Sequence, residues 1–87
     1  MTAYTVNIGS GAERDMADLH PTVQAAVDRR VLTLADDPRP HGAKPLKGRL
    51  KGLWRVRAGE HRIVYAVDDR ARTVTVYAVG PRGGVYD

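Results

Sequence analysis

The chain has 87 residues, the size of one small domain, and 43% of them are hydrophobic, which is ordinary for a globular protein. It contains no cysteine, so a disulfide framework and a thiolate site are excluded. No apolar run approaches the roughly 18 residues needed to cross a bilayer. The first residues, MTAYTVNI, lack the basic and apolar regions of a signal peptide. We therefore expect a single domain over residues 1–87, a cytoplasmic location and no membrane partner.

The net charge of +4 is distributed unevenly along the chain. Residues 1–37 hold three basic and six acidic residues, net −3, whereas residues 38–87 hold eleven basic and four acidic residues, net +7. Between Arg39 and Arg62 the only acid is Glu60. Such a basic region is typical of a protein that binds a polyanion, although a charge run by itself is explained equally well by a solvated surface.

The first elements in chain order are a strand and two helices. Residues 4–8 alternate apolar and polar side chains, which is the period of a half-buried strand. Ser10–Glu13 has the spacing of a capping box and predicts the start of a short helix. Pro21 suits the first position of a second helix, which we expect to end at Asp37–Pro38. Its predicted core stripe consists of Val23, Val27, Val31 and Leu34.

The second half of the chain predicts a basic loop followed by strands. Residues 38–52, PRPHGAKPLKGRLKG, hold three prolines and three glycines. A β-hairpin is predicted over residues 53–67, and a last strand over residues 73–79 follows a polar turn. The order β-α-α-β-β-β predicts an α+β fold, in which two helices pack on one face of a mainly antiparallel four-stranded sheet.

The hairpin gathers arginines on one face of this sheet. With its turn at Ala58–Gly59, Arg55 is expected opposite Arg62, and Arg57 opposite Glu60. Like charges that face each other across two strands repel, and a fold keeps such strain more readily where an anion relieves it. The planar donor fork of arginine also suits phosphate. The hairpin therefore favours phosphate binding, although long arginine stems that fan into water are the alternative.

Three segments together resemble the RelE/ParE superfamily of bacterial toxins, and within it the RelE-like, YoeB-similar mRNA interferases. They are KPLKG at 44–48, GLWRVRAGEHRIVYAV at 52–67, and VG-x-R…VY over 79–86. This resemblance covers nearly the whole chain and implies a RelE-like fold. It also implies the toxin of a type II toxin–antitoxin system, which cuts messenger RNA in the ribosomal A site. In that reaction a 2′-hydroxyl attacks the adjacent phosphate and leaves a 2′,3′-cyclic phosphate, with no cofactor and no metal ion.

The resemblance also implies which residues act. Arg62 matches the strand arginine that binds the scissile phosphate, and Arg55 matches a basic residue on the preceding strand. Arg82 matches the arginine that contacts phosphate and acts as the acid, and Tyr86 matches the tyrosine that stacks on or orients the base. The residues expected to contact RNA or the ribosome are Lys44, Lys47, Arg49, Lys51 and Arg57.

No matched residue is an obvious general base. Leu53 stands where some relatives have a second lysine, and the acid and the C-terminal histidine of the YoeB branch have no counterparts here. Arginine stays protonated. His61 is expected to face the core. For Glu60, a salt bridge to Arg57 is a simpler explanation than a role as the base. Charge stabilisation alone and a proton relay through Tyr86 are the interpretations that stay open.

The resemblance implies partners as well as a reaction. It implies a cognate antitoxin, RelB-like or another small type II antitoxin, whose disordered segment folds on binding. Operator DNA would be bound only through that antitoxin, and the resemblance further implies a ribosome with messenger RNA in its A site as a partner. Two alternatives stay open: a ParE-like inhibitor of DNA gyrase, and a degenerate RNA-binding member without catalysis.

Overall fold

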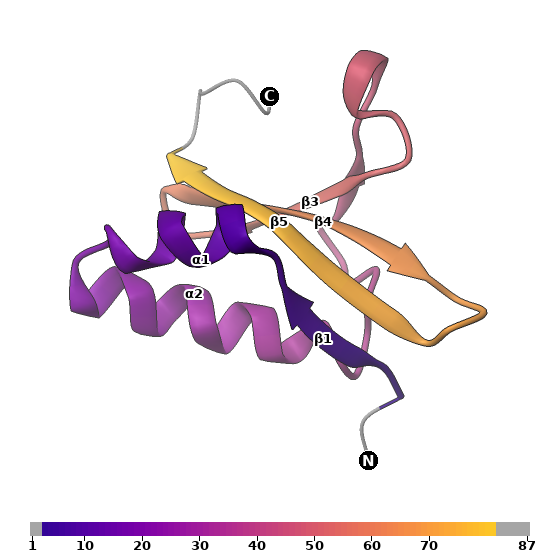
Figure 1. Ribbon diagram of the computed structural model, residues 1–87, viewed down its shortest axis with the longest axis horizontal. Coiled ribbons are helices and arrows are strands. Elements are labelled where there is room, and N and C mark those ends of the chain that lie inside the picture. The colour runs from indigo at the N-terminus through magenta and orange to yellow at the C-terminus, as the bar shows by residue number, and fades with distance from the viewer. Residues whose placement is uncertain (1–2, 82–87) are drawn as a thin grey trace.

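The computed structural model describes residues 3–81, which form one β-sheet with two helices on one of its sides (Figure 1). The elements are β1 (Thr5–Ile8), α1 (Ser10–Ala17), α2 (Pro21–Thr33), β2 (Lys44–Pro45), the 3₁₀ turn η1 (Gly48–Leu50), β3 (Trp54–Ala58), β4 (His61–Asp68) and β5 (Thr73–Pro81). The strand order is β1-β5-β4-β3-β2, with β1 parallel to β5 and all other neighbours antiparallel. The predicted α+β architecture is confirmed. None of the described helices has the length and hydropathy to span a bilayer.

The sheet has five strands where the sequence predicts four, because β2 lies within the predicted basic loop. Its two residues pair with the first two residues of β3. Two residues are too few to show the alternation of a strand, and Pro45, which lacks an N–H group, is suited only to an edge. After β2 the chain turns through η1, where Gly48 and Gly52 have positive φ angles of 65° and 99°.

Both predicted helices form, but their ends differ from the prediction. The residue that caps α1 is Gly9, with no side-chain hydrogen bond, so Ser10 is already helical and the capping box does not form. Pro21 opens α2 as predicted, and Nδ1 of His20 accepts a hydrogen bond from the Thr22 N–H at 3.2 Å. The helix ends at Thr33, four residues before Asp37, and the chain continues in turns in which the Asp36 and Asp37 N–H groups donate to the Thr33 carbonyl.

The core lies between the two helices and one face of the sheet. The side chains buried in it are Ala12, Val27, Val31, Leu34, Val56, Ile63, Tyr65, Val74, Val76 and Val79. The predicted stripe of α2 supplies Val27, Val31 and Leu34, and Val23 packs against the cluster from its edge. Burial of apolar side chains is the main stabilising term of so small a domain.

The β3–β4 hairpin has the predicted division of faces but a different register. Arg57 pairs with Arg62, Arg55 pairs with Val64, and the two-residue turn is Gly59–Glu60. The predicted turn at Ala58–Gly59 is therefore wrong, and the cross-strand pairing is shifted by two residues from the predicted one. The reason is backbone geometry: the turn that matches strand twist needs positive φ at its first central residue. Gly59 has φ 62° there, a conformation that alanine at position 58 would adopt only at a cost.

A β-bulge in β5 lies close to the residues through which this strand contacts α1. The pairing of β4 with β5 shifts between Val64 and Tyr65, so that Val76 and Val79 both face the core. Beyond this bulge the Val79 N–H donates to the Asp15 carboxylate of α1 at 2.9 Å. This contact gives the Val79 N–H an acceptor from outside the sheet, and it holds α1 against the C-terminal end of β5.

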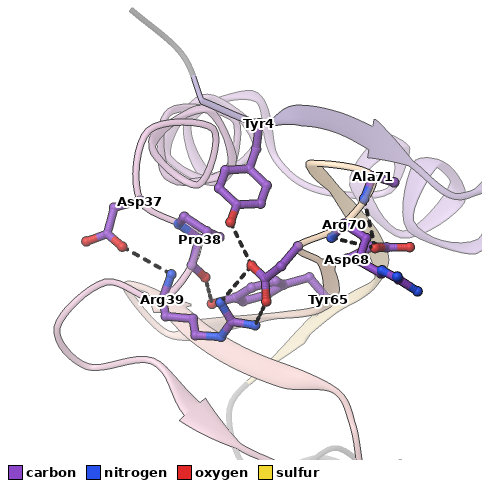
Figure 2. A network of polar contacts seen from close by, with 9 residues as sticks. Tyr4, Asp37, Pro38, Arg39, Tyr65, Asp68, Arg70 and Ala71 are labelled. Carbon is purple, nitrogen blue, oxygen red and sulfur yellow. Dashed lines mark hydrogen bonds and ion pairs between the residues drawn. The ribbon is translucent and has the colours of Figure 1, made fainter.

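A polar network around Asp69 holds the segment after α2 against the sheet (Figure 2). The Asp69 carboxylate accepts hydrogen bonds from the Tyr4 hydroxyl at 2.6 Å and from the Arg39 guanidinium at 2.9 and 3.2 Å. Next to it, the Tyr65 hydroxyl donates to the Pro38 carbonyl at 2.7 Å. The hydrogen bonds from Arg39 first, and from the Tyr4 hydroxyl second, stabilise the charged carboxylate, so the pKa of Asp69 lies below its usual value.

Candidate nucleic-acid interface

The side of the sheet away from the helices carries the arginine face, which we define as Arg55, Arg57 and Arg62. Arg57 and Arg62 are cross-strand partners, and Arg55 lies two residues earlier on β3, so the three side chains share one side. The opposite side of the hairpin is the apolar one that meets α2. The sequence predicts this division correctly, because a register error of two residues leaves the faces unchanged.

Arg62 is the buried member of this group. It is 3% exposed and is the one charged residue among those described that is buried. It lies on β4 between two strands, and its partner on β5 is Gly80, which has no side chain to compete for the space. Burial restricts the rotamers that a long side chain can adopt, so the Arg62 side chain has less conformational freedom than an exposed arginine. A fixed guanidinium is what transition-state stabilisation of a phosphate requires.

The floor beside these arginines is apolar. Val64 is 1% exposed and pairs with both Arg55 and Ala78, which is 6% exposed. Because these three residues are in register across their strands, Val64 and Ala78 lie on the same side of the sheet as the arginines. Charges beside an apolar floor are less well screened than charges in open water, so an anion bound there interacts more strongly.

The predicted basic loop is an ordered extension of the sheet edge. The Leu46 N–H donates to the Leu53 carbonyl at 2.9 Å, which closes the segment that carries η1, and this segment projects away from the helices (Figure 1). The predicted contact residues Lys47, Arg49 and Lys51 lie on it and are exposed, and Lys44, also exposed, lies just before it on β2. Lys44 pairs with Arg55, so the basic segment is continuous with the arginine face.

The remaining predicted residues have different outcomes. Arg82 and Tyr86 lie outside the described residues. His61 is half-buried and pairs with Ala58, which packs against the core, so it lies on the side of the sheet opposite to Arg62. Glu60 is a turn residue rather than the cross-strand partner of Arg57, whose place is taken by Arg62. The predicted pairing of Glu60 with Arg57 is therefore wrong.

Arg30 of α2 belongs to this region, and sequence patterns do not identify it. Its Nε donates to the Arg57 carbonyl at 3.2 Å, and it lines a pocket with Lys44, Arg55 and Arg57. In the sequence it follows Arg29 on a helix whose apolar residues form the core stripe. Only its position toward the C-terminal end of α2, next to the edge of β3, separates it from an ordinary surface arginine.

The chain is similar in sequence to known toxins. A family model described as the ParE toxin of the type II toxin–antitoxin system parDE matches residues 6–86. Toxin RelG of Mycobacterium tuberculosis is 36% identical over 84 residues, which cover 95% of both chains. Toxin RelE of the same organism is also 36% identical over 84 residues, which cover 95% of this chain and 86% of the relative.

The fold agrees with these sequence matches. The toxin–antitoxin complex RelBE2 from Mycobacterium tuberculosis contains a chain that superposes with a TM-score of 0.83 and 34% identity. That superposition covers 92% of the present chain and 99% of the other. The sheet order and the two helices described above are therefore shared over almost the full length of both molecules.

Proposed function

Because this chain belongs to the RelE/ParE family of type II toxin–antitoxin toxins, we propose that it is a ribosome-dependent mRNA endonuclease. The observation that carries the proposal is the arginine face, in which the buried Arg62 is paired with Arg57 and neighboured by Arg55. Phosphoryl chemistry needs fixed positive charge around the phosphate. Inhibition of translation follows from loss of the messenger RNA.

The proposed reaction is a transesterification within the RNA. The 2′-oxygen forms a bond to the adjacent phosphorus while the bond from phosphorus to the 5′-oxygen breaks. The proton of the 2′-hydroxyl passes to a water molecule. The 5′-oxygen takes up the proton that Arg82 donates and becomes a hydroxyl, and Arg82 regains a proton from solvent. Arg62 and Arg55 bind the non-bridging oxygens, whose negative charge grows in the transition state. No metal ion takes part in this proposal.

The tail residues complete the proposed site. Arg82 contacts the phosphate and supplies the proton of the leaving group, and Tyr86 stacks on the base, which contributes about 1–3 kcal/mol to binding. No side chain of the arginine face is a good proton acceptor, because arginine remains protonated at physiological pH. Catalysis therefore relies on charge stabilisation and on the ribosome, which holds the substrate in a reactive orientation.

The proposed partners follow from the same surfaces. Lys44, Lys47, Arg49 and Lys51 project from the sheet edge and contact ribosomal RNA phosphates. The similar RelBE2 chain is part of a toxin–antitoxin complex, which supports a RelB-like antitoxin as the partner of this chain. That antitoxin covers the arginine face with acidic residues and provides the contacts to operator DNA. All of this takes place in the cytoplasm.

Primer extension on messenger RNA after brief induction tests the proposal. Arg62→Gln is expected to lower the cleavage rate by about 100-fold or more, as for the loss of one transition-state donor. Arg70→Gln, which removes an exposed arginine from the β4–β5 turn, is the matched control and is expected to cleave normally. His61→Gln is expected to retain cleavage because His61 lies on the other side of the sheet. Equal cleavage by the Arg62 and Arg70 variants would contradict the proposal.

A second candidate function is inhibition of DNA gyrase. It is favoured by the family model, whose description is that of a ParE toxin. In this case the arginine face would bind a protein or DNA surface, and the messenger RNA would stay intact. Loss of DNA supercoiling on induction, with no cuts in messenger RNA, would establish this candidate in place of the first.

A further inference from the structure

A pocket of about 280 Å³ opens at the free edge of β3. Its lining residues are Arg30, Gly42, Lys44, Arg55, Val56 and Arg57. Four of the six are cations and none is an acid, so the pocket has a strongly positive lining. It overlaps the arginine face at Arg55 and Arg57, and it extends past the strand edge to Arg30 of the helix layer and to Val56 on the core side of β3.

The local architecture explains why the pocket exists. β2 pairs only with Trp54 and Arg55, so within the described residues the second half of β3 has no strand on this side. Arg30 reaches this open edge from α2, and its Nε donates to the Arg57 carbonyl. Gly42 turns the chain on the far side with φ 95°, and a Cβ atom there would meet nothing within 4 Å. The pocket is the space that remains between helix, loop and strand edge.

The charges around this space favour an anionic ligand. Neither residue of the Arg39–Asp69 salt bridge lines the pocket, so this salt bridge does not neutralise a lining cation. Four cations around one pocket repel one another, and a bound anion relieves this repulsion. The hydrogen bond to Arg57 uses one of the five N–H donors of Arg30, and it orients the guanidinium plane at the edge.

The size of the pocket and its connection to the arginine face indicate the ligand. Its volume is below the roughly 300–1,000 Å³ of sites for drug-sized molecules, so it suits a single small group. Arg57 lines the pocket and is also the cross-strand partner of Arg62. Arg57 therefore connects the pocket to the place where a phosphate bound at Arg62 would lie. A peptide strand is disfavoured, because Arg30 already occupies the Arg57 carbonyl that strand addition would need.

We propose that this pocket binds a backbone phosphodiester next to the scissile one, and that Arg30 is a positioning residue for the RNA strand. The inference rests on the proposed nuclease function for the identity of the strand. It adds a contact from the helix layer to those of the sheet and the basic segment. Holding two phosphates of one strand fixes both the place and the direction of the RNA relative to Arg62.

Binding of a single-stranded RNA that cannot be cut tests this inference. The probe is a fluorescent oligonucleotide of about ten nucleotides, comparable to the roughly 4–16 nucleotides that one OB fold covers, with 2′-O-methyl groups that block the attacking oxygen. Its dissociation constant is measured by anisotropy at several salt concentrations. Arg30→Gln is expected to weaken binding roughly tenfold, as for a lost charged hydrogen bond. The slope of the logarithm of the binding constant against the logarithm of the salt concentration should also become less steep by about 0.7, the value for one phosphate contact on a single strand.

The matched control is Arg29→Gln, which removes the same charge from the preceding, exposed position of α2. Arg29→Gln is expected to leave the salt slope at its wild-type value. Arg30→Lys should keep most of the wild-type slope, because lysine still binds phosphate as a point charge. Circular dichroism and thermal unfolding establish that each variant is folded, and Lys44→Gln, at a strand edge, gives an independent test of the same pocket.

The outcomes separate this inference from the function on which it rests. One outcome is that the Arg29 and Arg30 variants have equal salt slopes while the wild type binds RNA and cuts it on the ribosome. That result would refute phosphate binding in the pocket and would leave the proposed nuclease function intact. Absence of both RNA binding and cleavage in the wild type would overturn both. Weaker binding of an acidic antitoxin peptide by Arg30→Gln, with RNA binding unchanged, would assign the pocket to the antitoxin and overturn the RNA contact.

Discussion

Tyr65 connects the core of the molecule to the segment that follows α2. Its ring is fully buried among the apolar side chains of the sheet, and its hydroxyl donates to the Pro38 carbonyl at 2.7 Å. Burial disfavours the phenolate and raises the pKa of Tyr65 to about 12, although Arg30 and Arg39 nearby act in the opposite direction. The folded state therefore holds this side chain in its neutral form.

Replacement of Tyr65 tests this role in stability. Tyr65→Phe is expected to lower the free energy of unfolding by about 1–2 kcal/mol, because the buried Pro38 carbonyl loses its donor. The raised pKa means that the contribution of the wild-type residue is complete below a pH of about 10 and is lost as the pH rises from there toward about 12. The measurement is urea unfolding at neutral pH and over the alkaline range.

Tyr77→Phe is the control, since this ring is 51% exposed and lies outside the core. The difference between wild type and Tyr65→Phe should shrink as the solution becomes alkaline. A difference that stays constant throughout the alkaline range, or that is already absent at neutral pH, would show that the hydroxyl does not contribute as described.

The β3–β4 hairpin is the element on which the candidate site depends. Its two strands carry all three residues of the arginine face, and their register decides which arginines are neighbours. That register is set by Gly59, because the two-residue turn needs positive φ at this position. The alternation of side chains predicts which residues share a face, but it is insensitive to a shift of two residues, and so it does not predict the pairing of Arg57 with Arg62.

Substitution of Gly59 measures how strongly the turn fixes the register. Gly59→Ala is expected to destabilise the protein by about 1–2 kcal/mol, since an L-residue is strained at φ 62° even though a Cβ atom would meet no neighbour. Urea unfolding gives the loss, with an unchanged m-value if the fold is kept. Glu60→Ala, at the other turn position, is the control. A stability loss no larger than that of the control would contradict the assigned turn.

The molecule as a whole is small and carries its charges asymmetrically. Its acidic residues are concentrated in the first 37 residues, whereas the basic excess lies in the segment and strands that form the candidate interface. A domain of this size buries a limited core, and its stability is correspondingly modest. A partner that binds only the folded state then raises the apparent stability by mass action.

Titration with the cognate antitoxin tests the proposed partner at this scale. The melting temperature is expected to rise with antitoxin concentration, and at about 100 times the dissociation constant the added stability is about 2.7 kcal/mol. Differential scanning fluorimetry gives the shift, and the Arg29→Gln variant, altered outside the interface, should behave as the wild type does. A melting temperature that does not depend on antitoxin concentration would contradict this expectation.

The sequence by itself determined both helices, the longer strands, the faces of the hairpin and the family. Alternation and helical spacing are local properties, so they predicted the core stripe of α2 and the arginine side of the hairpin before any contact was known. The resemblance to RelE-like toxins lies in the same local segments. These features depend on neighbours within a few residues, and they do not require the chain to be folded in space.

The tertiary structure alone decided the register of the hairpin, the presence of β2, the burial of Arg62 and the place of Arg30. Each of these depends on segments far apart in the sequence: the cross-strand partner of Arg62 on β5 is Gly80, and the open edge of β3 receives an arginine from α2. Long-range contacts of this kind leave no periodic pattern in the chain. They arise because packing and backbone hydrogen bonds are satisfied over the whole molecule at once.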